Sequence, residues 1–185
     1  TEDFDWNSRL AGFQGVLLPG GGDIDPARYG QEAQTEELYG IDELQDAADL
    51  SLAQWCIEHA VPMLAICRGF QIVNVVQGGS LVQHMAKDHR HVVHSLRLDA
   101  DVDRLGLSSD VIESSCYHHQ AVDRLGSGLR VIARAAEGHP EAFAIENGGW
   151  AYGLQWHPED NAQSDRNQAE IFSRFVSEAA ASKAI

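Results

Sequence analysis

The chain has 185 residues, 44% of them hydrophobic and 22% charged, which is enough for one domain with a sizeable core. Its formal net charge of −15 argues against a nucleic-acid partner, because phosphate binding needs clustered lysine and arginine. No apolar run approaches the ~20 residues that a membrane span needs, and no export signal opens the sequence, so we expect a cytoplasmic protein without a membrane partner.

The first third of the sequence predicts a strand, a long loop and a helix. An apolar strand pattern covers residues 13–19 and runs into a glycine-rich turn, and the polar residues 27–41 are predicted to form a surface loop. Residues 42–60 show the spacing of an amphipathic helix. Its predicted apolar face consists of Leu44, Ala48, Leu52 and Trp55, and acidic residues fall elsewhere.

The later elements continue the alternation of strands and helices. A buried strand is predicted at 61–66 and a helix at 69–77, which two glycines end. The middle of the chain is rich in strands, predicted at 92–98, 111–114, 129–135, 142–145 and 150–156. A second amphipathic helix covers 164–183, with an apolar face of Ile171, Phe172, Phe175, Val176 and Ala179. This order implies an α/β sheet with helices on both faces, in a single domain over residues 1–185.

The stretch PMLAICRGFQ places Cys67 between a predicted strand and a predicted helix, which is the arrangement of a nucleophile elbow. The sharp turn needs small neighbours, and Ala65 and Gly69 supply them. The helix that begins near Gly69 points its free N–H groups toward the sulfur and favours the thiolate. The alternative is a buried cysteine that closes a core strand, and this stretch alone does not separate the two interpretations. The three cysteines form no CxxC pair, so free thiols are expected.

Two further segments favour the nucleophile. In GLQWHPED, the carboxylate of Glu159 can bond one ring nitrogen of His157, which leaves the other nitrogen free to take a proton from Cys67. In LPGGGDIDP, glycines after a strand let backbone N–H groups face a ligand, as an oxyanion hole requires. The glycine stretch is not a phosphate-binding loop, because no GK[ST] follows it.

Four motifs in one order, LPGGGDIDP, AICRGFQIVNVVQGGSL, CYHHQAV and GLQWHPE, resemble the class I glutamine amidotransferase-like hydrolases. The sequence is most similar to the γ-glutamyl-γ-aminobutyrate hydrolase branch, from about Phe13 to about Glu159. The resemblance implies a flavodoxin-like α/β sandwich with a mostly parallel central sheet. It also implies a catalytic triad of Cys67, His157 and Glu159, and neither a metal nor an organic cofactor.

The resemblance implies a γ-glutamyl amide of a small amine as substrate, with γ-glutamyl-γ-aminobutyrate from polyamine or putrescine breakdown as the best named candidate. Cys67 would attack the γ-carbonyl carbon, and the backbone N–H groups of Arg68 and Gly21 would hold the oxyanion. The residues expected near the substrate are Gly20, Gly22, Gln71, His118, His119, Gln120 and Glu141. Adjacent histidines on an extended segment face opposite ways, so one of the pair is expected to contact ligand directly. Glu141 would receive the substrate's α-amino group, and Gln71 would support the elbow more than touch substrate.

A zinc site is not expected in DHRHVVH, because His89, His91 and His94 lack helical two-ligand spacing and an acidic partner at fixed offset. Relatives usually carry an additional strand–helix–strand segment before LPGGGD, and we expect the working protein to have that segment although this sequence lacks it. Cys116 stands where relatives often carry a hydroxyl residue.

Two other functions stay open at this point. One is a glutaminase domain or subunit that supplies ammonia to a synthase partner, which the HHQ signature disfavours. The other is a catalytically quiet binding module, which the presence of Cys67, His157 and Glu159 disfavours. The sequence also leaves open whether the protein forms a homo-oligomer.

Overall fold

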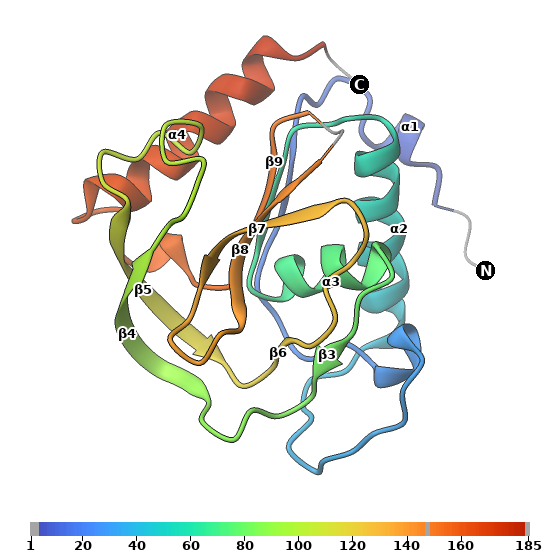
Figure 1. Cartoon of the computed structure of the whole chain (residues 1–185). Helices are drawn as coiled ribbons and strands as arrows, with labels where there is room; N and C mark the ends of the chain where they lie inside the picture. The colour runs from blue at the N-terminus through green and yellow to red at the C-terminus, as the bar shows by residue number, and fades with distance from the viewer. Residues whose placement is uncertain (1–3, 147–148, 184–185) are drawn as a thin grey trace.

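A mixed five-stranded sheet forms the centre of the molecule in the computed structural model, which describes residues 4–146 and 149–183 (Figure 1). Adjacent β1, β2 and β9 are parallel, whereas β8 is antiparallel to both β9 and β7. Four of the five strands therefore run in one direction, and the expected mostly parallel α/β sheet is confirmed. The strand order is β1 (Val16–Leu18), β2 (Met63–Ile66), β9 (Ala151–Leu154), β8 (Pro140–Ile145) and β7 (Leu129–Arg134).

Helices cover both faces of this sheet, as Figure 1 shows. Helices α2 (Glu43–Glu58) and α3 (Arg68–Val76) lie on one side, and α4 (Arg166–Ala181) lies on the other. A long antiparallel hairpin of β4 (His89–Arg97) and β5 (Val111–His118) flanks the sheet on the α4 side. The remaining elements are short: α1 (Trp6–Arg9), β3 (Leu81–Val82), β6 (Ala121–Val122) and the 3-10 turns η1 (Pro26–Tyr29) and η2 (Pro158–Asp160).

Strand β2 separates two hydrophobic clusters because successive side chains of a strand point to opposite faces. Met63 and Ala65 belong to the cluster with Cys56 of α2 and Phe70 of α3. Leu64 and Ile66 belong to the cluster that includes the β4–β5 hairpin and Ile171 of α4. All four residues of β2 are buried, which explains why its sequence is continuously apolar.

The predicted apolar faces of the two long helices were partly wrong. Leu44, in the first turn of α2, is 57% exposed, whereas Asp46 is completely buried because it pairs with the guanidinium of Arg68. In α4, Ile171 is completely buried but Val176 is 62% exposed. Helix α4 lies on the sheet along a stripe narrower than its apolar sequence pattern.

Several boundaries also differ from the sequence prediction. The strand expected at 111–114 extends to His118, because its pairing with β4 continues to His89. The loop expected at 27–41 begins within η1, which the Asp25 side chain caps by accepting from the N–H of Ala27. Strands β3 and β6 have two residues each, too few to give a periodic signal. None of the helices in the described ranges is long and apolar enough to cross a membrane.

Candidate active site

Cys67 lies at a sharp turn between β2, which ends at Ile66, and α3, which begins at Arg68. Its backbone has φ +52° and ψ −102°, a conformation that L-residues rarely adopt. The N–H of Cys67 donates to the carbonyl oxygen of Leu154 on the neighbouring strand at 2.7 Å, which ties the turn to the sheet. The expected nucleophile elbow is therefore present, with the sulfur at the N-terminus of α3.

Two glycines allow close approach around this elbow. A Cβ atom on Gly69 would lie 2.5 Å from the carbonyl oxygen of Leu18, so a larger residue would push α3 away from β1. A Cβ atom on Gly20 would lie 2.8 Å from Cε1 of His157 and 3.6 Å from Cβ of Cys67. The absence of a side chain at Gly20 thus lets the imidazole lie beside the thiol.

His157 and Glu159 are positioned by the end of β9 and the turn η2. The backbone N–H of His157 donates to the carbonyl oxygen of Ser115 at 2.8 Å. Nδ1 of His157 lies 2.6 Å from Oε1 of Glu159, and the ring of Tyr117 meets the imidazole edge-on at 5.1 Å between centroids. The sequence-predicted triad is therefore brought together, with Nε2 of His157 on the Cys67 side.

The environment of His157 favours its protonated form. Burial alone would lower the pKa of the imidazole, but its interactions with the side chains of Cys67 and Glu159 raise that pKa to about 10. A protonated imidazole beside a sulfur at a helix N-terminus is the arrangement of a thiolate–imidazolium pair.

The other two cysteines have different surroundings. All three cysteines are free, and Cys56 lies on the buried face of α2. Burial raises the pKa of the Cys56 thiol to about 12, which makes it an unreactive core residue, as its sequence context suggested. Cys116 is completely buried on β5.

The backbone N–H groups expected to hold an oxyanion come from Gly21 and Arg68. The Arg68 guanidinium is buried and turned toward α2, where it pairs with Asp46 at 2.5 Å and also with Asp49. A Cβ atom on Gly21 would lie 2.9 Å from Cδ of Arg68, so the glycine loop crosses closely over the start of α3. Within the described residues, neither of these two N–H groups donates to a backbone acceptor. They remain available to a ligand.

A narrow cleft opens beside the sulfur, between the glycine loop, the elbow and the end of β5. Both adjacent histidines line it, as expected for residues near the substrate. His118 bonds through Nδ1 to the carbonyl oxygen of Gln120 at 2.8 Å, and the amide nitrogen and oxygen of the Gln120 side chain are buried without a partner. The lining residues are Gly21, Gly22, Asp23, Tyr39, Cys67, Arg68, Gln71, Tyr117, His118, His119 and Gln120.

The sequence interpretation missed a polar chain that runs from this cleft. Nε2 of His119 lies 3.0 Å from a carboxylate oxygen of Asp23, and its Nδ1 lies 3.0 Å from Nδ1 of His84. Burial raises the pKa of Asp23, although hydrogen bonds from Tyr39 and His119 oppose the shift. Asp23 stood inside the motif LPGGGDIDP, whereas His84 gave no local signal because its contact spans 35 residues.

Of two further residues expected near substrate, Gln71 lies at the cleft and Glu141 does not. Gln71 lines the cleft and donates from Nε2 to Oε1 of Gln155 at 3.2 Å, which fits the expected support of the elbow. Glu141 is completely buried and is not among the lining residues. Its Oε1 lies 3.5 Å from Nδ1 of His89 and 3.7 Å from Nε2 of His118.

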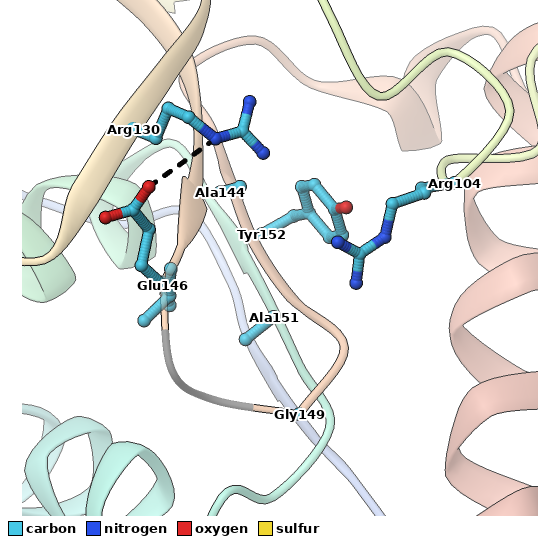
Figure 2. Close-up of a pocket in the computed structure, with 8 residues that line it drawn as sticks. Arg104, Arg130, Ala144, Glu146, Gly149, Ala151 and Tyr152 are labelled. Carbon is cyan, nitrogen blue, oxygen red and sulfur yellow. Dashed lines mark ion pairs between the residues drawn. The ribbon is translucent and has the colours of Figure 1, made fainter.

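A larger cavity of about 390 Å³ lies elsewhere, beside the ends of β7, β8 and β9 (Figure 2). Figure 2 shows Arg130 paired with Glu146 at 3.7 Å, and Arg104 on the other side of the Tyr152 ring. Its lining contains no nucleophile–base pair, so the smaller cleft at Cys67 is the candidate active site.

Comparison with known proteins gives a family match and several relatives. The family model described as peptidase C26 matches residues 2–159. A Mycobacterium tuberculosis protein named "Putative glutamine amidotransferase Rv2859c" is 34% identical over 166 residues, which cover 81% of this chain and 52% of that protein. A protein of Escherichia coli O157:H7 named gamma-glutamyl-gamma-aminobutyrate hydrolase is 27% identical over 186 residues, which cover 90% of this chain and 72% of that protein.

The fold is shared with solved structures. The crystal structure of a glutamine amido transferase from Methylobacillus flagellatus superposes with a TM-score of 0.65 at 14% identity, covering 89% of this chain and 76% of that one. The present chain thus spans about half the length of the M. tuberculosis relative and about three quarters of the other two proteins.

Proposed function

The chain belongs to the peptidase C26 family, and on that premise we propose that it is a cysteine hydrolase of γ-glutamyl amides of small amines. One observation carries the proposal. Cys67 occupies a positive-φ turn at a helix N-terminus, beside a histidine whose Nδ1 lies 2.6 Å from Glu159. This constellation suits acyl transfer through a thioester. The relatives named as γ-glutamyl-γ-aminobutyrate hydrolases make that compound the first substrate to test.

In the first step of the proposed reaction, the Cys67 thiolate attacks the γ-carbonyl carbon and the carbonyl oxygen becomes an oxyanion. The N–H groups of Gly21 and Arg68 stabilise that charge. The Arg68 guanidinium takes no part, because Asp46 and Asp49 hold it away from the cleft. His157 then protonates the leaving nitrogen, the C–N bond breaks, and the free amine departs from a γ-glutamyl thioester on Cys67.

In the second step, His157, which is neutral after it has protonated the amine, acts as a base. It takes a proton from a water molecule, the hydroxide attacks the thioester carbon, and the C–S bond breaks to release glutamate. Glu159 holds Nδ1 of the imidazole, so that Nε2 exchanges the proton in both steps. The products are one glutamate and one amine.

Gln120 is the residue best placed to recognise the glutamyl part of the substrate. Its side-chain nitrogen and oxygen are both buried and unpaired, and it lines the cleft. A buried amide without partners is costly, and a ligand that offers one acceptor and one donor would satisfy it. The α-amino and α-carboxylate groups of glutamate offer these two, which favours Gln120 for this contact over Glu141, since Glu141 does not line the cleft.

A second candidate function is the supply of ammonia from glutamine to a synthase. The name of the M. tuberculosis relative favours it, because an amidotransferase uses glutamine as nitrogen donor. The same thioester chemistry would serve both reactions, so the two candidates differ in the leaving group that the cleft accepts.

The test is the rate of glutamate release from γ-glutamyl-γ-aminobutyrate, a γ-glutamyl-polyamine and glutamine, measured on the same enzyme preparation. The proposal predicts that a γ-glutamyl conjugate of a small amine has the highest kcat/KM. Preference for glutamine would support the ammonia donor instead. Failure to release glutamate from all three would contradict the proposed substrate class.

A further inference from the structure

Four potential metal ligands converge next to the cleft, from three different strands. His89 begins β4, Cys116 and His118 lie on β5, and Glu141 lies on β8. One ligand atom from each of the four lies within 4.8 Å of the ligand atoms of the other three. Each residue is at most 4% exposed, so this four-residue cluster is closed to bulk solvent.

The facing nitrogen and oxygen atoms of the cluster make no hydrogen bond, whereas Sγ of Cys116 lies 3.5 Å from Nε2 of His94. Nδ1 of His89, Nε2 of His118 and both carboxylate oxygens of Glu141 are buried and unpaired among the described residues. The Glu141 carboxylate lies within ion-pair distance of both rings but hydrogen-bonds to neither, and a carboxylate buried in that state is costly. A native interior seldom leaves so many polar atoms unpaired in one place, so these atoms point to a bound cation.

The hydrogen bond at the opposite ring nitrogen assigns the tautomer of His118. Nδ1 of His118 lies 2.8 Å from the carbonyl oxygen of Gln120 and must donate to it, so Nε2 of the neutral ring is a lone pair that faces Glu141. Nε2 of His89 lies 3.5 Å from the carboxylate of Glu137, which is an ion-pair distance, and in a neutral ring with its proton on Nε2 the Nδ1 lone pair would also face Glu141. Two lone pairs and a carboxylate repel one another unless a positive charge lies between them. Ring nitrogens held by a carboxylate or a carbonyl oxygen are also the usual outer partners of metal-bound histidines.

The separations fit a tetrahedral ion. Zn²⁺ at about 2.0–2.3 Å from its ligands places neighbouring ligand atoms roughly 3.3–3.8 Å apart. Oε1 of Glu141 lies 3.5 Å from Nδ1 of His89 and 3.7 Å from Nε2 of His118. Two imidazoles, one thiolate and one carboxylate form a donor set that suits zinc and not the oxygen-seeking Ca²⁺ or Mg²⁺.

We propose that His89, Cys116, His118 and Glu141 form a closed zinc site that ties β4, β5 and β8 together. Binding of Zn²⁺ releases the thiol proton of Cys116 to solvent. The thiolate and the carboxylate together balance the two positive charges of the ion, so the buried complex is neutral. Because His118 also lines the cleft, the ion would hold the wall formed by residues 117–120 in place.

The proposed site departs from the expectation that the protein holds no metal. That expectation weighed only the spacing of His89, His91 and His94 within one segment. Of these three, only His89 belongs to the cluster, and its nearest acidic ligand is 52 residues further along the chain.

The test is the binding of Co²⁺ and Zn²⁺ to the full chain after removal of metals with a chelator, with folding checked by circular dichroism. Tetrahedral cobalt bound to a thiolate gives a charge-transfer absorption band, which reports directly on a sulfur ligand. We expect this band to saturate at one Co²⁺ per chain and to disappear when Zn²⁺ displaces the cobalt. We also expect Zn²⁺ to raise the melting temperature.

Cysteine variants locate the ligand. Cys116→Ser should lose the band and bind Zn²⁺ more than ~100-fold more weakly, since even outer-shell changes cost 10–100-fold. Cys67→Ala and Cys56→Ala should both retain the band. Glu141→Gln, which keeps the side-chain volume, should weaken Zn²⁺ binding while leaving a thiolate band at high cobalt.

Three results would overturn the proposal. The first is wild-type protein that is folded but binds neither Co²⁺ nor Zn²⁺, which does not depend on any variant folding. The second is a band that persists at full strength in Cys116→Ser. The third is a band that is lost in Cys67→Ala, which would place the metal at the elbow instead. None of these results depends on hydrolytic activity.

Discussion

Cys67 has a backbone conformation that costs of order 1–3 kcal/mol, and its neighbours compensate for it. The strained turn presents the sulfur at a helix N-terminus and beside Nε2 of His157. The helix dipole and the imidazole therefore act on the same atom. Removing a partner should therefore affect the reaction more than the fold.

His157→Gln should lower kcat for glutamate release by ~10²–10⁴-fold, because the variant loses the group that moves the proton in both steps. KM should change less, since His157 is absent from the cleft lining that would hold the glutamyl group. Steady-state kinetics on the best substrate measures both. His59→Gln is the matched control, because the His59 ring is exposed at the end of α2. Equal rates for His157→Gln and the wild type would contradict the triad.

Stability should depend on pH through the same histidine. The folded pKa of His157 is raised to about 10 from its ordinary value of 6.5, so its contribution to stability is fully present below about pH 6.5. That contribution is lost as the pH rises through about 10, where the folded protein releases the proton. The difference in melting temperature between wild type and His157→Gln should therefore shrink steadily over this window. A difference that grows toward alkaline pH would contradict the assignment.

At the scale of elements, the site depends on how closely α3 packs on β1 and α2. Gly69 touches the backbone of Leu18, and Arg68 is clamped by two aspartates of α2. Gly69 thus lets α3 pack closely on β1, and the buried ion pairs of Arg68 tie α3 to α2.

Gly69→Ala should destabilise the protein, because its Cβ would lie 2.5 Å from the Leu18 carbonyl oxygen and 2.7 Å from the Leu18 Cβ. Overpacking of this kind costs ~1–3 kcal/mol, at roughly 2–4 °C in Tm per kcal/mol for a chain of this size. Gly138→Ala is the control, since nothing lies within 4 Å of its Cβ position and only its φ of +94° opposes the change. A lower Tm for Gly138→Ala than for Gly69→Ala would contradict the explanation by a steric clash with Leu18.

Asp46→Ala should lower the free energy of unfolding by ~3–5 kcal/mol, because it leaves the Arg68 guanidinium buried with one partner fewer. Asp110→Ala is the control, as its ion pair with Arg97 is exposed and should be worth at most ~1 kcal/mol. Urea unfolding of both variants measures the difference. Similar losses for the two would show that the buried pair has no special role.

At the scale of the whole molecule, the fold and the triad were accessible from sequence because their signals are local. The apolar run of β2, the small residues around Cys67 and the His157–Glu159 spacing each lie within a few residues. Features that depend on contacts between distant segments were not accessible. They include the burial of Asp46, the contact of His84 with His119, and the meeting of β4, β5 and β8 around Glu141.

The exposed side of α4 shows the same limit. Sequence periodicity locates a helix and the direction of its apolar face. The width of the stripe that becomes buried depends on how the helix lies on the sheet. Val176 is apolar and 62% exposed for this reason, and the pattern alone could not separate it from Phe175.

The measurement that tests the central claim most directly is glutamate release from γ-glutamyl-γ-aminobutyrate by the wild type, Cys67→Ala and Cys56→Ala. We predict release by the wild type and by Cys56→Ala, and none above background by Cys67→Ala. The two cysteines differ in that one lies at a strained turn facing a protonated histidine and the other lies in the core. Release that persists in Cys67→Ala would contradict the claim that Cys67 is the nucleophile.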